Sequence, residues 1–500
     1  MDIILLGLKF FSDPIPLIGL ASGVLFGIIF GCIPGLTATL GVILIIPFTF
    51  GMAPELGISI LIGIYVGGIS GGLITAILLN IPGTPSSFVT CWDGYPLAKK
   101  GLPGTALSLG VFSSGVGGMF SALALIFIAP QLSKVALKFG SWEYFAIMIL
   151  GMSVVVMMTS DNPVKGLIAS CIGIILGTVG FDTVSGVTRL TFDLWQMQGG
   201  IHIIALTMGI FAVREILSQV NSGLQSGPTG ESTEIKDKIR LIPEQKVLKG
   251  TGPAFILGCV YGTMMGILPG VGQGTATMLA YNGSRQLSKQ PEKFGKGAPE
   301  GLVASETSNN AVCGGALIPL LTLGVPGDTV TAVLIGGLMI QGIQPGPMFF
   351  TAYPRMVGAI MVAYFLANVF MMIMELGFMR IFVKISRVPL SLLFPVILLS
   401  CIFGTFSTNN RVFDVWMLVA IGVIGYFLIE CDVPVPPIVL GYILGPMIEK
   451  NFRTAMYTAR GNVMAITGRP VALAIVIFSV ILVIWPYISD YLKRRKMAVA

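Results

Sequence analysis

Charged side chains are scarce in this chain of 500 residues, where Asp, Glu, Lys and Arg together make up 11%. A soluble domain carries about 25% charged residues, because its surface faces water. Hydrophobic residues make up 54%, and the mean hydropathy is +0.89. This composition excludes secreted miniproteins, disordered regulators and ordinary cytoplasmic enzymes, and it predicts a protein embedded in lipid.

Histidine and paired cysteines are also rare. His202 is the only histidine, and the seven cysteines are far apart, with no CxxC pair. The sequence therefore offers no metal cluster and no Ser-His or Cys-His dyad, and we expect no metal and no cofactor. The positive charges are scattered between apolar runs, so nothing supports nucleic-acid binding. No GxxxxGK[ST] loop is present, so energy from ATP would need another subunit.

A membrane enzyme is not expected either. Residues 324–328 read GVPGD, which has one residue too many for the GxGD motif of intramembrane aspartyl proteases. The partner aspartate on a neighbouring span is missing, and so are the aspartate pairs of prenyl transfer. We therefore expect a protein that is not an enzyme.

Long apolar runs predict about 11–12 full transmembrane helices and hence an all-α polytopic fold. A helix rises about 1.5 Å per residue, so roughly 20 apolar residues cross a hydrocarbon core of about 30 Å. The runs lie near residues 15–33, 56–80, 104–129, 143–160, 164–181, 253–268, 299–323, 355–383, 388–405, 412–429 and 470–488.

Three further apolar runs are too short to cross the bilayer. They lie near 37–50, 329–343 and 436–449, and as helices they would reach only about 21 Å. We expect broken or re-entrant half-helices there. Lipid offers no partner to unpaired peptide groups, so such segments persist only inside protein or beside a watery cavity. Broken helices therefore indicate a site.

Pro-Gly pairs mark the breaks, and they recur in order along the chain. The segment GCIPGLTATL from Gly31 is similar to GILPGVGQGTATML from Gly266. The segment GGLITAILLNIPGTP from Gly71 is similar to GGALIPLLTLGVPGDT from Gly314. Proline ends a helix and glycine permits close backbone approach, so each pair exposes amides. One such pair would be an ordinary turn, whereas several in the same order at nearly constant separation predict a duplication.

We accordingly expect two homologous transmembrane repeats, residues 1–217 and 251–450, joined by a polar linker at 218–250. The linker begins with Ser and Gly, which is typical of a flexible, solvated connector. An extra span and a basic tail occupy 451–500. The basic residues at 493–496 place the C-terminus in the cytoplasm by the positive-inside rule. The sequence leaves open whether the repeats are parallel or inverted.

Matching broken helices in two repeats are typical of a transporter's binding site near the bilayer midplane. Helix N-termini there offer free amides and a positive dipole end, which favour a carboxylate. Ser, Thr and Asn side chains beside the breaks have an alternative role as hydrogen bonds between helices. We predict that a carboxylate substrate binds at the following residues: Pro34, Gly35, Thr37, Pro82, Gly83, Thr84, Ser86, Pro269, Gly270, Asn309, Asn310, Pro326, Gly327 and Thr329.

Glu306 lies inside a predicted span, with Asn309 and Asn310 three and four positions later on the same helical face. A carboxylate at that depth is costly unless it meets a cation, a proton or a donor. We predict that Glu306, Asn80 and Thr275 take part in cation or proton coupling, with Na⁺ or H⁺ as the coupling ion. The alternative is that the span begins later and leaves Glu306 at the membrane interface.

Four runs of the sequence resemble the large membrane subunit of the tripartite tricarboxylate transporter family. They read GCIPGLTATLGVILIIPFTFG, YVGGISGGLITAILLNIPGTPSSFVTCWDGYPLAKKG, FGKGAPEGLVASETSNNAVCGGALIPLLTLGVPGD and GLMIQGIQPGPMFF. The resemblance extends from Gly19 to about Arg460. It implies a secondary importer of citrate-like or other carboxylates in the bacterial inner membrane. It also implies two partners, a small membrane subunit with about four spans and a periplasmic solute-binding protein.

The same resemblance assigns roles to the motif residues. The family's Pro-Gly loops fall on the four pairs at 34–35, 82–83, 269–270 and 326–327, and its acid-Asn-Asn element falls on Glu306, Asn309 and Asn310. Two positions depart from the pattern, since Ser305 stands where proline is usual and Asp328 where a small residue is common. Asp328 adjoins a loop, where the alternative role is to cap a helix. An acid beside a carboxylate site leaves the exact ligand open.

We expect the chain to work by ion-coupled alternating access between the two sides of the membrane. Two alternatives remain at this point. A passive anion channel uses similar half-helices as a filter, and a scaffold subunit of a larger permease would carry no substrate itself.

Overall fold

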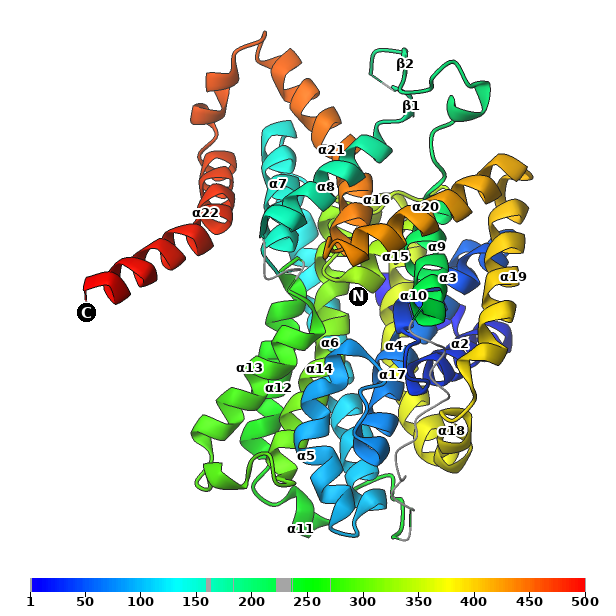
Figure 1. Ribbon diagram of the computed structural model, residues 1–500, viewed down its shortest axis with the longest axis vertical. Coiled ribbons are helices and arrows are strands. Elements are labelled where there is room, and N and C mark those ends of the chain that lie inside the picture. The colour runs from blue at the N-terminus through cyan, green and yellow to red at the C-terminus, as the bar shows by residue number, and fades with distance from the viewer. Residues whose placement is uncertain are drawn as a thin grey trace.

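The computed structural model describes residues 2–158, 163–182, 184–221, 235, 237–269 and 271–499. Almost every element is a helix, which confirms the all-α polytopic fold class (Figure 1). Within the described residues, seven helical runs are long and apolar enough to span a membrane: Pro14–Cys32, Pro54–Leu79, Pro103–Ala136, Ile203–Asn221, Pro354–Gly377, Leu390–Asn409 and Val412–Glu430.

The first half of the chain contains the helices α1 (Asp2–Phe10), α2 (Pro14–Cys32), α3 (Ala38–Thr49), α4 (Pro54–Leu79), η1 (Pro85–Ser87), α5 (Phe88–Lys99), α6 (Pro103–Ala136), α7 (Ser141–Met158), α8 (Pro163–Gly177), η2 (Trp195–Met197), α9 (Ile203–Met208), the π-helical η3 (Gly209–Val213) and α10 (Arg214–Asn221). Two strands of two residues each, β1 (Gly180–Phe181) and β2 (Thr188–Arg189), pair in antiparallel orientation.

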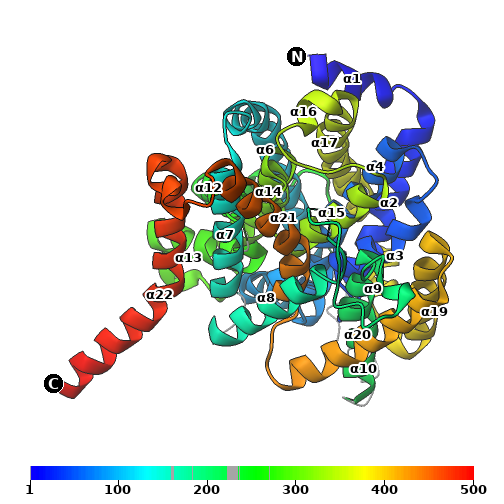
Figure 2. The same ribbon diagram turned by 90° about the horizontal axis from the view of Figure 1, so that it is seen from above.

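The second half contains α11 (Gln245–Leu248), α12 (Gly252–Ile267), α13 (Gly272–Leu287), η4 (Pro291–Lys293), α14 (Pro299–Leu323), α15 (Thr329–Ile340), α16 (Phe349–Ala352), α17 (Pro354–Gly377), α18 (Met379–Ile385), α19 (Leu390–Asn409), α20 (Val412–Glu430), α21 (Pro436–Thr458), η5 (Val463–Gly468) and α22 (Pro470–Val499). Seen from above, α4 and α14 lie toward the middle, whereas α22 extends away from the body (Figure 2).

Glycines allow the central helices to approach until their backbones touch. On α2, a β-carbon at Gly23, Gly27 or Gly31 would lie within 2.4 Å of a carbonyl oxygen of α4. On α12, glycines at the same spacing, Gly258 to Gly266, face α14 in the same way, and a β-carbon at Gly266 would lie 2.4 Å from the carbonyl oxygen of Val312. Small residues at such seams are how helices pack tightly without water.

These matching contacts are what a duplicated chain would produce, and the two repeats stay a prediction. The central pair of helices is shielded from lipid: in α4, 94% of the apolar window is buried inside the protein. The outer helices α19 and α20 are only 28% buried in the same sense, so they offer their apolar side chains to lipid.

Several boundaries differ from the expectations. Residues 37–50 and 329–343 form the short helices α3 and α15, as predicted, but the third short run continues to Thr458 as α21. The expected span 355–383 is interrupted at Phe378, between α17 and α18. The apolar run of α9, η3 and α10 was missed as a candidate span.

The described part of the predicted linker is attached to the helical body. Asp237 accepts hydrogen bonds from the backbone amide of Thr105 (2.7 Å) and from its hydroxyl (2.8 Å), at the first turn of α6. The Arg240 amide also donates to Ser108 Oγ over 2.9 Å. A carboxylate at a helix N-terminus is favoured by the helix dipole. Residues 222–234 and 236 lie outside the described residues.

Candidate functional site

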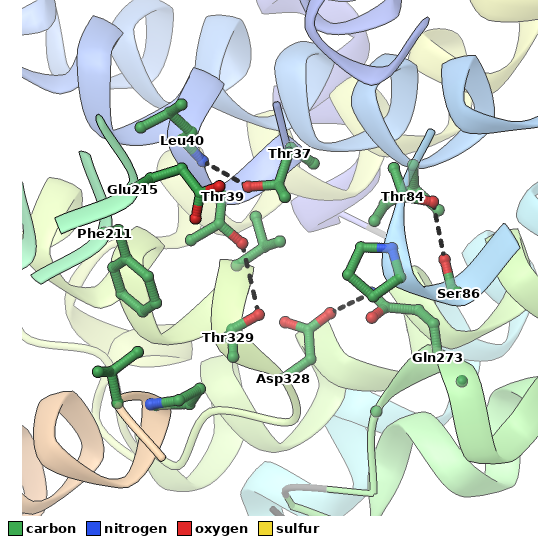
Figure 3. A pocket seen from close by; sticks show the side chains of 18 of the residues that line it. Thr37, Thr39, Leu40, Thr84, Ser86, Phe211, Glu215, Gln273, Asp328 and Thr329 are labelled. Atoms are coloured by element: carbon green, nitrogen blue, oxygen red, sulfur yellow. Dashed lines mark hydrogen bonds between the residues drawn. The ribbon is translucent and has the colours of Figure 1, made fainter. Parts of the chain in front are cut away.

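Four chain breaks lead directly into helix N-termini, and these N-termini surround one pocket. The helices are α3, the η1–α5 pair, α13 and α15. The pocket has a volume of about 480 Å³, within the range of small-molecule sites. Figure 3 shows Thr37 and Thr39 from α3, Thr84 and Ser86 beside η1, and Gln273, Asp328 and Thr329 from the second half around the same space.

In the first half, hydroxyl side chains fix the two helix starts. Thr37 is the N-cap of α3, and its Oγ1 accepts from the Leu40 amide over 3.2 Å. Thr84 forms a capping box with Ser87, whose hydroxyl accepts from the Thr84 amide over 3.1 Å. The preceding Gly35 has φ +90°, a left-handed conformation that glycine adopts without strain. Capping therefore ends each break at a defined residue and turns the helix start toward the pocket.

In the second half, Asp328 organises the start of α15. It is the N-cap, with Oδ1 accepting from the Thr331 amide over 2.7 Å. Its other oxygen accepts from Gln273 Nε2 on α13 over 2.6 Å and from the hydroxyl of the fully buried Tyr65 on α4. The expectation that Asp328 caps a helix is therefore confirmed. The same carboxylate also lines the pocket and ties three helices together.

The helix starts of the two halves meet in crossed pairs. Thr39 Oγ1 on α3 lies 3.4 Å from Thr329 Oγ1 on α15. The start of the first half's η1 contacts α13 of the second half. Each end of the pocket is thus formed by two helix starts, one from the first half and one from the second half.

A charged pair comes from a segment that the sequence analysis did not include in the site. Phe211 lies in the π-helical η3, and Arg214 and Glu215 begin α10, all three lining the pocket. Arg214 NH1 donates to Glu215 Oε2 over 2.7 Å, and its Nε donates to the Ile210 carbonyl over 3.3 Å. Single π-helical turns are frequent at functional sites.

The pocket combines a few full charges with partial charges from the helix starts. Among the described lining residues, Arg214 is the one basic side chain, and Glu215 and Asp328 are the acidic ones. The four helix starts add partial positive charge through their unpaired amides. Hydroxyls of Thr39 and Ser86, both largely buried, add donors that can rotate toward a ligand. This combination suits an anion accompanied by a positive charge.

The structure brings part of the predicted substrate site to the pocket and places the rest behind it. The predicted residues that line the pocket are Gly35, Thr37, Thr84, Ser86 and Thr329. The predicted residues that do not line it are Pro34, Pro82, Gly83, Pro269, Asn309, Asn310, Pro326 and Gly327. Gly270 lies outside the described residues.

The two glycines behind the pocket make backbone contacts. A β-carbon at Gly83 would lie 2.5 Å from the Gly31 carbonyl oxygen, and one at Gly327 would lie 2.5 Å from the Gly266 carbonyl oxygen. These distances leave no room for a side chain. Gly83 therefore lets the second break of the first half pack against the end of α2. Gly327 likewise lets the second break of the second half pack against the end of α12.

The predicted coupling residues lie in three different places. Glu306 is fully buried in α14, where it accepts from Thr90 and from Ser114 Oγ (2.8 Å). Asn80 is the left-handed C-cap of α4 and is exposed, and Thr275 is half-buried in the first turn of α13. α14 begins at Pro299, seven residues before Glu306, and the depth of Glu306 in the membrane stays a prediction.

Sequence reasoning missed Arg214 and Glu215 for an identifiable reason. They lie at the end of the expected first repeat, residues 1–217, away from every Pro-Gly break from which the site was predicted. A signal was present, since an adjacent Arg-Glu pair directly after an uncharged apolar run is unusual in a chain with so little charge. The residues at 434–436, which line the pocket before α21, carried no comparable signal.

Comparisons with known proteins identify the family of the chain. The model of the tripartite tricarboxylate transporter TctA family matches residues 17–440. An uncharacterized 52.8 kDa protein of Agrobacterium vitis, from the TAR-I ttuC' 3' region, is 35% identical over 99% of this chain and 98% of its own length. A second Agrobacterium vitis protein, from the TAR-II ttuC' 3' region, is 35% identical over 47% of this chain and 97% of its own length.

No solved structure matches the chain. The family match covers most of the sequence, including all four chain breaks and the residues of the pocket up to Leu440. The apolar helices and the family together indicate a multi-pass membrane protein. The chain therefore belongs to the tripartite tricarboxylate transporter TctA family, whose members are subunits of a tricarboxylate transporter.

Proposed function

We propose that this chain is the substrate-carrying subunit of an ion-coupled importer for tricarboxylates or related carboxylates. The observation that carries the proposal is the convergence of four helix N-termini and Arg214 on one pocket. Such an arrangement offers several separate positions for carboxylate groups. A tricarboxylate is a ligand whose charges are spread over several groups, and it matches a pocket whose positive charge is spread in the same way.

The anion is held mainly by the backbone. The first residues of α3, η1, α13 and α15 present amides, and Thr37, Thr84, Ser86 and Thr329 present hydroxyls beside them. Arg214 adds a charged donor, because its NH2 group can donate to a carboxylate beside the pair with Glu215. The Leu40 and Thr331 amides are bound by their caps, and the other first amides of these helices have no carbonyl partner within the helix.

Positive charge must travel with the substrate. Glu215 and Asp328 already face the pocket, and a multivalent anion inside a membrane is costly unless a cation neutralises it. We infer that Na⁺ or H⁺ enters together with the carboxylate, which couples uptake to an ion gradient. Glu306, Asn80 and Thr275 remain the residues proposed for this coupling, with the buried Glu306 having the strongest support.

Alternating access then exposes the pocket to one side of the membrane at a time. In this proposal the protein lies in the bacterial inner membrane with its C-terminus in the cytoplasm. A periplasmic solute-binding protein delivers the substrate, and a small membrane subunit completes the complex. Membership of a tripartite family supports both partners.

The test is uptake by the complex reconstituted with both partners in sealed vesicles. Labelled citrate and other carboxylates are supplied under imposed Na⁺ or pH gradients. The proposal expects accumulation above the external concentration, abolished by an ionophore that collapses the driving gradient. If the chain were a passive channel, the label would only equilibrate. If it were a scaffold subunit, the complex would still transport normally after pocket residues of this chain are replaced. Either of those results would contradict the proposal.

A further inference from the structure

A second polar cluster lies directly behind the wall of the pocket. Ile69 of α4 lines the pocket, and its carbonyl accepts from Asn309 Nδ2 of α14 over 3.4 Å. The next residue, Ser70, donates from its hydroxyl to Glu375 Oε2 of α17 over 2.7 Å. One turn of α4 therefore contacts the pocket on one side and a buried carboxylate and amide on the other.

Glu306 belongs to the same cluster. Its two carboxylate oxygens accept from Thr90 of α5 and Ser114 of α6, and Asn309 lies one turn later on the same face of α14. Thr90 lies in the first turn of α5, just after the residues of η1 that reach the pocket. The contact of Asn309 with Ile69 places this face of α14 beside the turn of α4 from which Ser70 reaches Glu375. We call Ser70, Thr90, Ser114, Glu306, Asn309 and Glu375 the acidic cluster.

The acidic cluster has more acceptors than donors. Glu306 and Glu375 both have no exposed surface, and in the described part of the chain no basic side chain forms an ion pair with either of them. Glu375 Oε1 and Asn309 Oδ1 are buried and have no hydrogen-bond partner. Unpartnered buried acceptors are rare in folded proteins, and a bound ion is one of the features that explains them.

Other titratable groups nearby do not supply the missing charge. The thiols that act electrostatically on the two carboxylates are Cys91 of α5, next to Glu306, and Cys32 of α2, next to Glu375. Thiols in apolar surroundings are neutral at pH 7 and bring no positive charge. Two like charges buried together without a partner are costly by several kcal/mol, so the cluster needs a cation or a proton.

We propose that the acidic cluster binds one small monovalent cation, Na⁺ or H⁺, and that this is where the coupling ion enters. The inference rests on the proposed function and adds Glu375 and the hydroxyls of Ser70, Thr90 and Ser114 to the coupling machinery. The positive charge on this cluster and the anion in the pocket attract each other across the Ile69–Ser70 turn. Binding of either one therefore favours binding of the other by the same factor.

The test uses the complete complex in vesicles and the variants Glu375→Gln and Glu306→Gln. Glutamine has nearly the same shape but no charge to neutralise, so each variant is expected to keep measurable exchange of labelled citrate without a gradient. Gradient-driven accumulation is expected to fall at least about tenfold. Separate arms impose a Na⁺ gradient at constant pH and a pH gradient without Na⁺, which identify the ion.

The matched control is Asp414→Asn, another fully buried carboxylate, which sits on α20 and accepts from Asn409 Nδ2 over 2.9 Å. It belongs to neither the pocket nor the acidic cluster, so accumulation should stay at the wild-type level. Wild-type accumulation in both glutamate variants would overturn the inference while leaving the proposed function intact. Absence of exchange of every labelled carboxylate in the wild-type complex would instead refute the proposed function.

A milder variant decides the case in which the glutamate variants lose exchange as well. Ser70→Ala keeps both carboxylates and removes only the hydroxyl that donates to Glu375. We expect it to raise the half-saturating concentration of the coupling cation several-fold, about 1 kcal/mol for one lost hydrogen bond. An unchanged half-saturating concentration in Ser70→Ala would overturn the inference.

Discussion

At the scale of single residues, Arg214 and Asp328 set the charge of the pocket from opposite sides. Arg214 is paired with Glu215 at 2.7 Å and retains 16% side-chain exposure, so part of its guanidinium faces the cavity. Asp328 is 4% exposed and accepts hydrogen bonds from three helices. With its NH1 and Nε groups already bonded, Arg214 would bind a ligand carboxylate through NH2, whereas Asp328 connects the helices around the pocket.

Replacing Arg214 by glutamine should weaken substrate binding. A hydrogen bond to a charged group contributes about 1.5–3 kcal/mol, so we expect KM for citrate uptake to rise about tenfold or more. Initial uptake rates against citrate concentration measure this. The matched control is Arg240→Gln, an arginine half-exposed beside Glu244 and outside the pocket. If Arg214→Gln changed KM as little as Arg240→Gln does, the role given to Arg214 would be contradicted.

Replacing Asp328 by alanine should destabilise the fold as well as the site. The variant loses the N-cap of α15 and leaves Tyr65 buried without its acceptor, a combined cost of about 2–4 kcal/mol. Thermal unfolding in detergent gives the measurement. Asp13→Ala is the comparison, since Asp13 caps α2 in an exposed position and should cost about 1 kcal/mol. Equal losses in the two variants would show that Asp328 is only an ordinary cap.

At the scale of elements, the short helices α3 and α15 are the parts that sequence reasoning located best. Their starts carry local signals, a Pro-Gly break and a capping residue, so that α15 begins at Thr329 as expected. Elements without such signals were placed less well. The helix α21 continues nine residues past its apolar run because Arg453 pairs with Glu449 and the helix packs on α7. Apolar length does not report such contacts.

The fit of the chain breaks gives a prediction at this scale. Gly327→Ala and Gly83→Ala each place a methyl group against a carbonyl oxygen 2.5 Å away, which displaces the break at a cost of about 1–3 kcal/mol. We expect uptake to fall strongly in both, while circular dichroism shows unchanged helix content. At Gly252 a β-carbon meets nothing within 4 Å, so Gly252→Ala should transport normally. Normal uptake by Gly327→Ala would refute the proposed packing.

At the scale of the whole molecule, the pocket combines segments that are far apart in the chain. The sequence predicted that the breaks contribute to one site, and five of the predicted residues line the pocket. It could not predict the crossed pairing of α3 with α15 and of η1 with α13, because the order of motifs does not fix which helix starts meet. Nor could it place Arg214 or the contact of Glu375 with Ser70, which arise only when α10 and α17 pack on the core.

The central claim is that interrupted helices from both halves enclose a carboxylate between their N-termini. The most direct measurement is an experimental structure of the reconstituted complex determined with citrate present. The account predicts ligand density between Thr37, Ser86, Arg214, Gln273 and Thr329, with carboxylate groups within hydrogen-bond distance of the helix-start amides. Citrate bound at another position, with this pocket filled only by water or side chains, would contradict it.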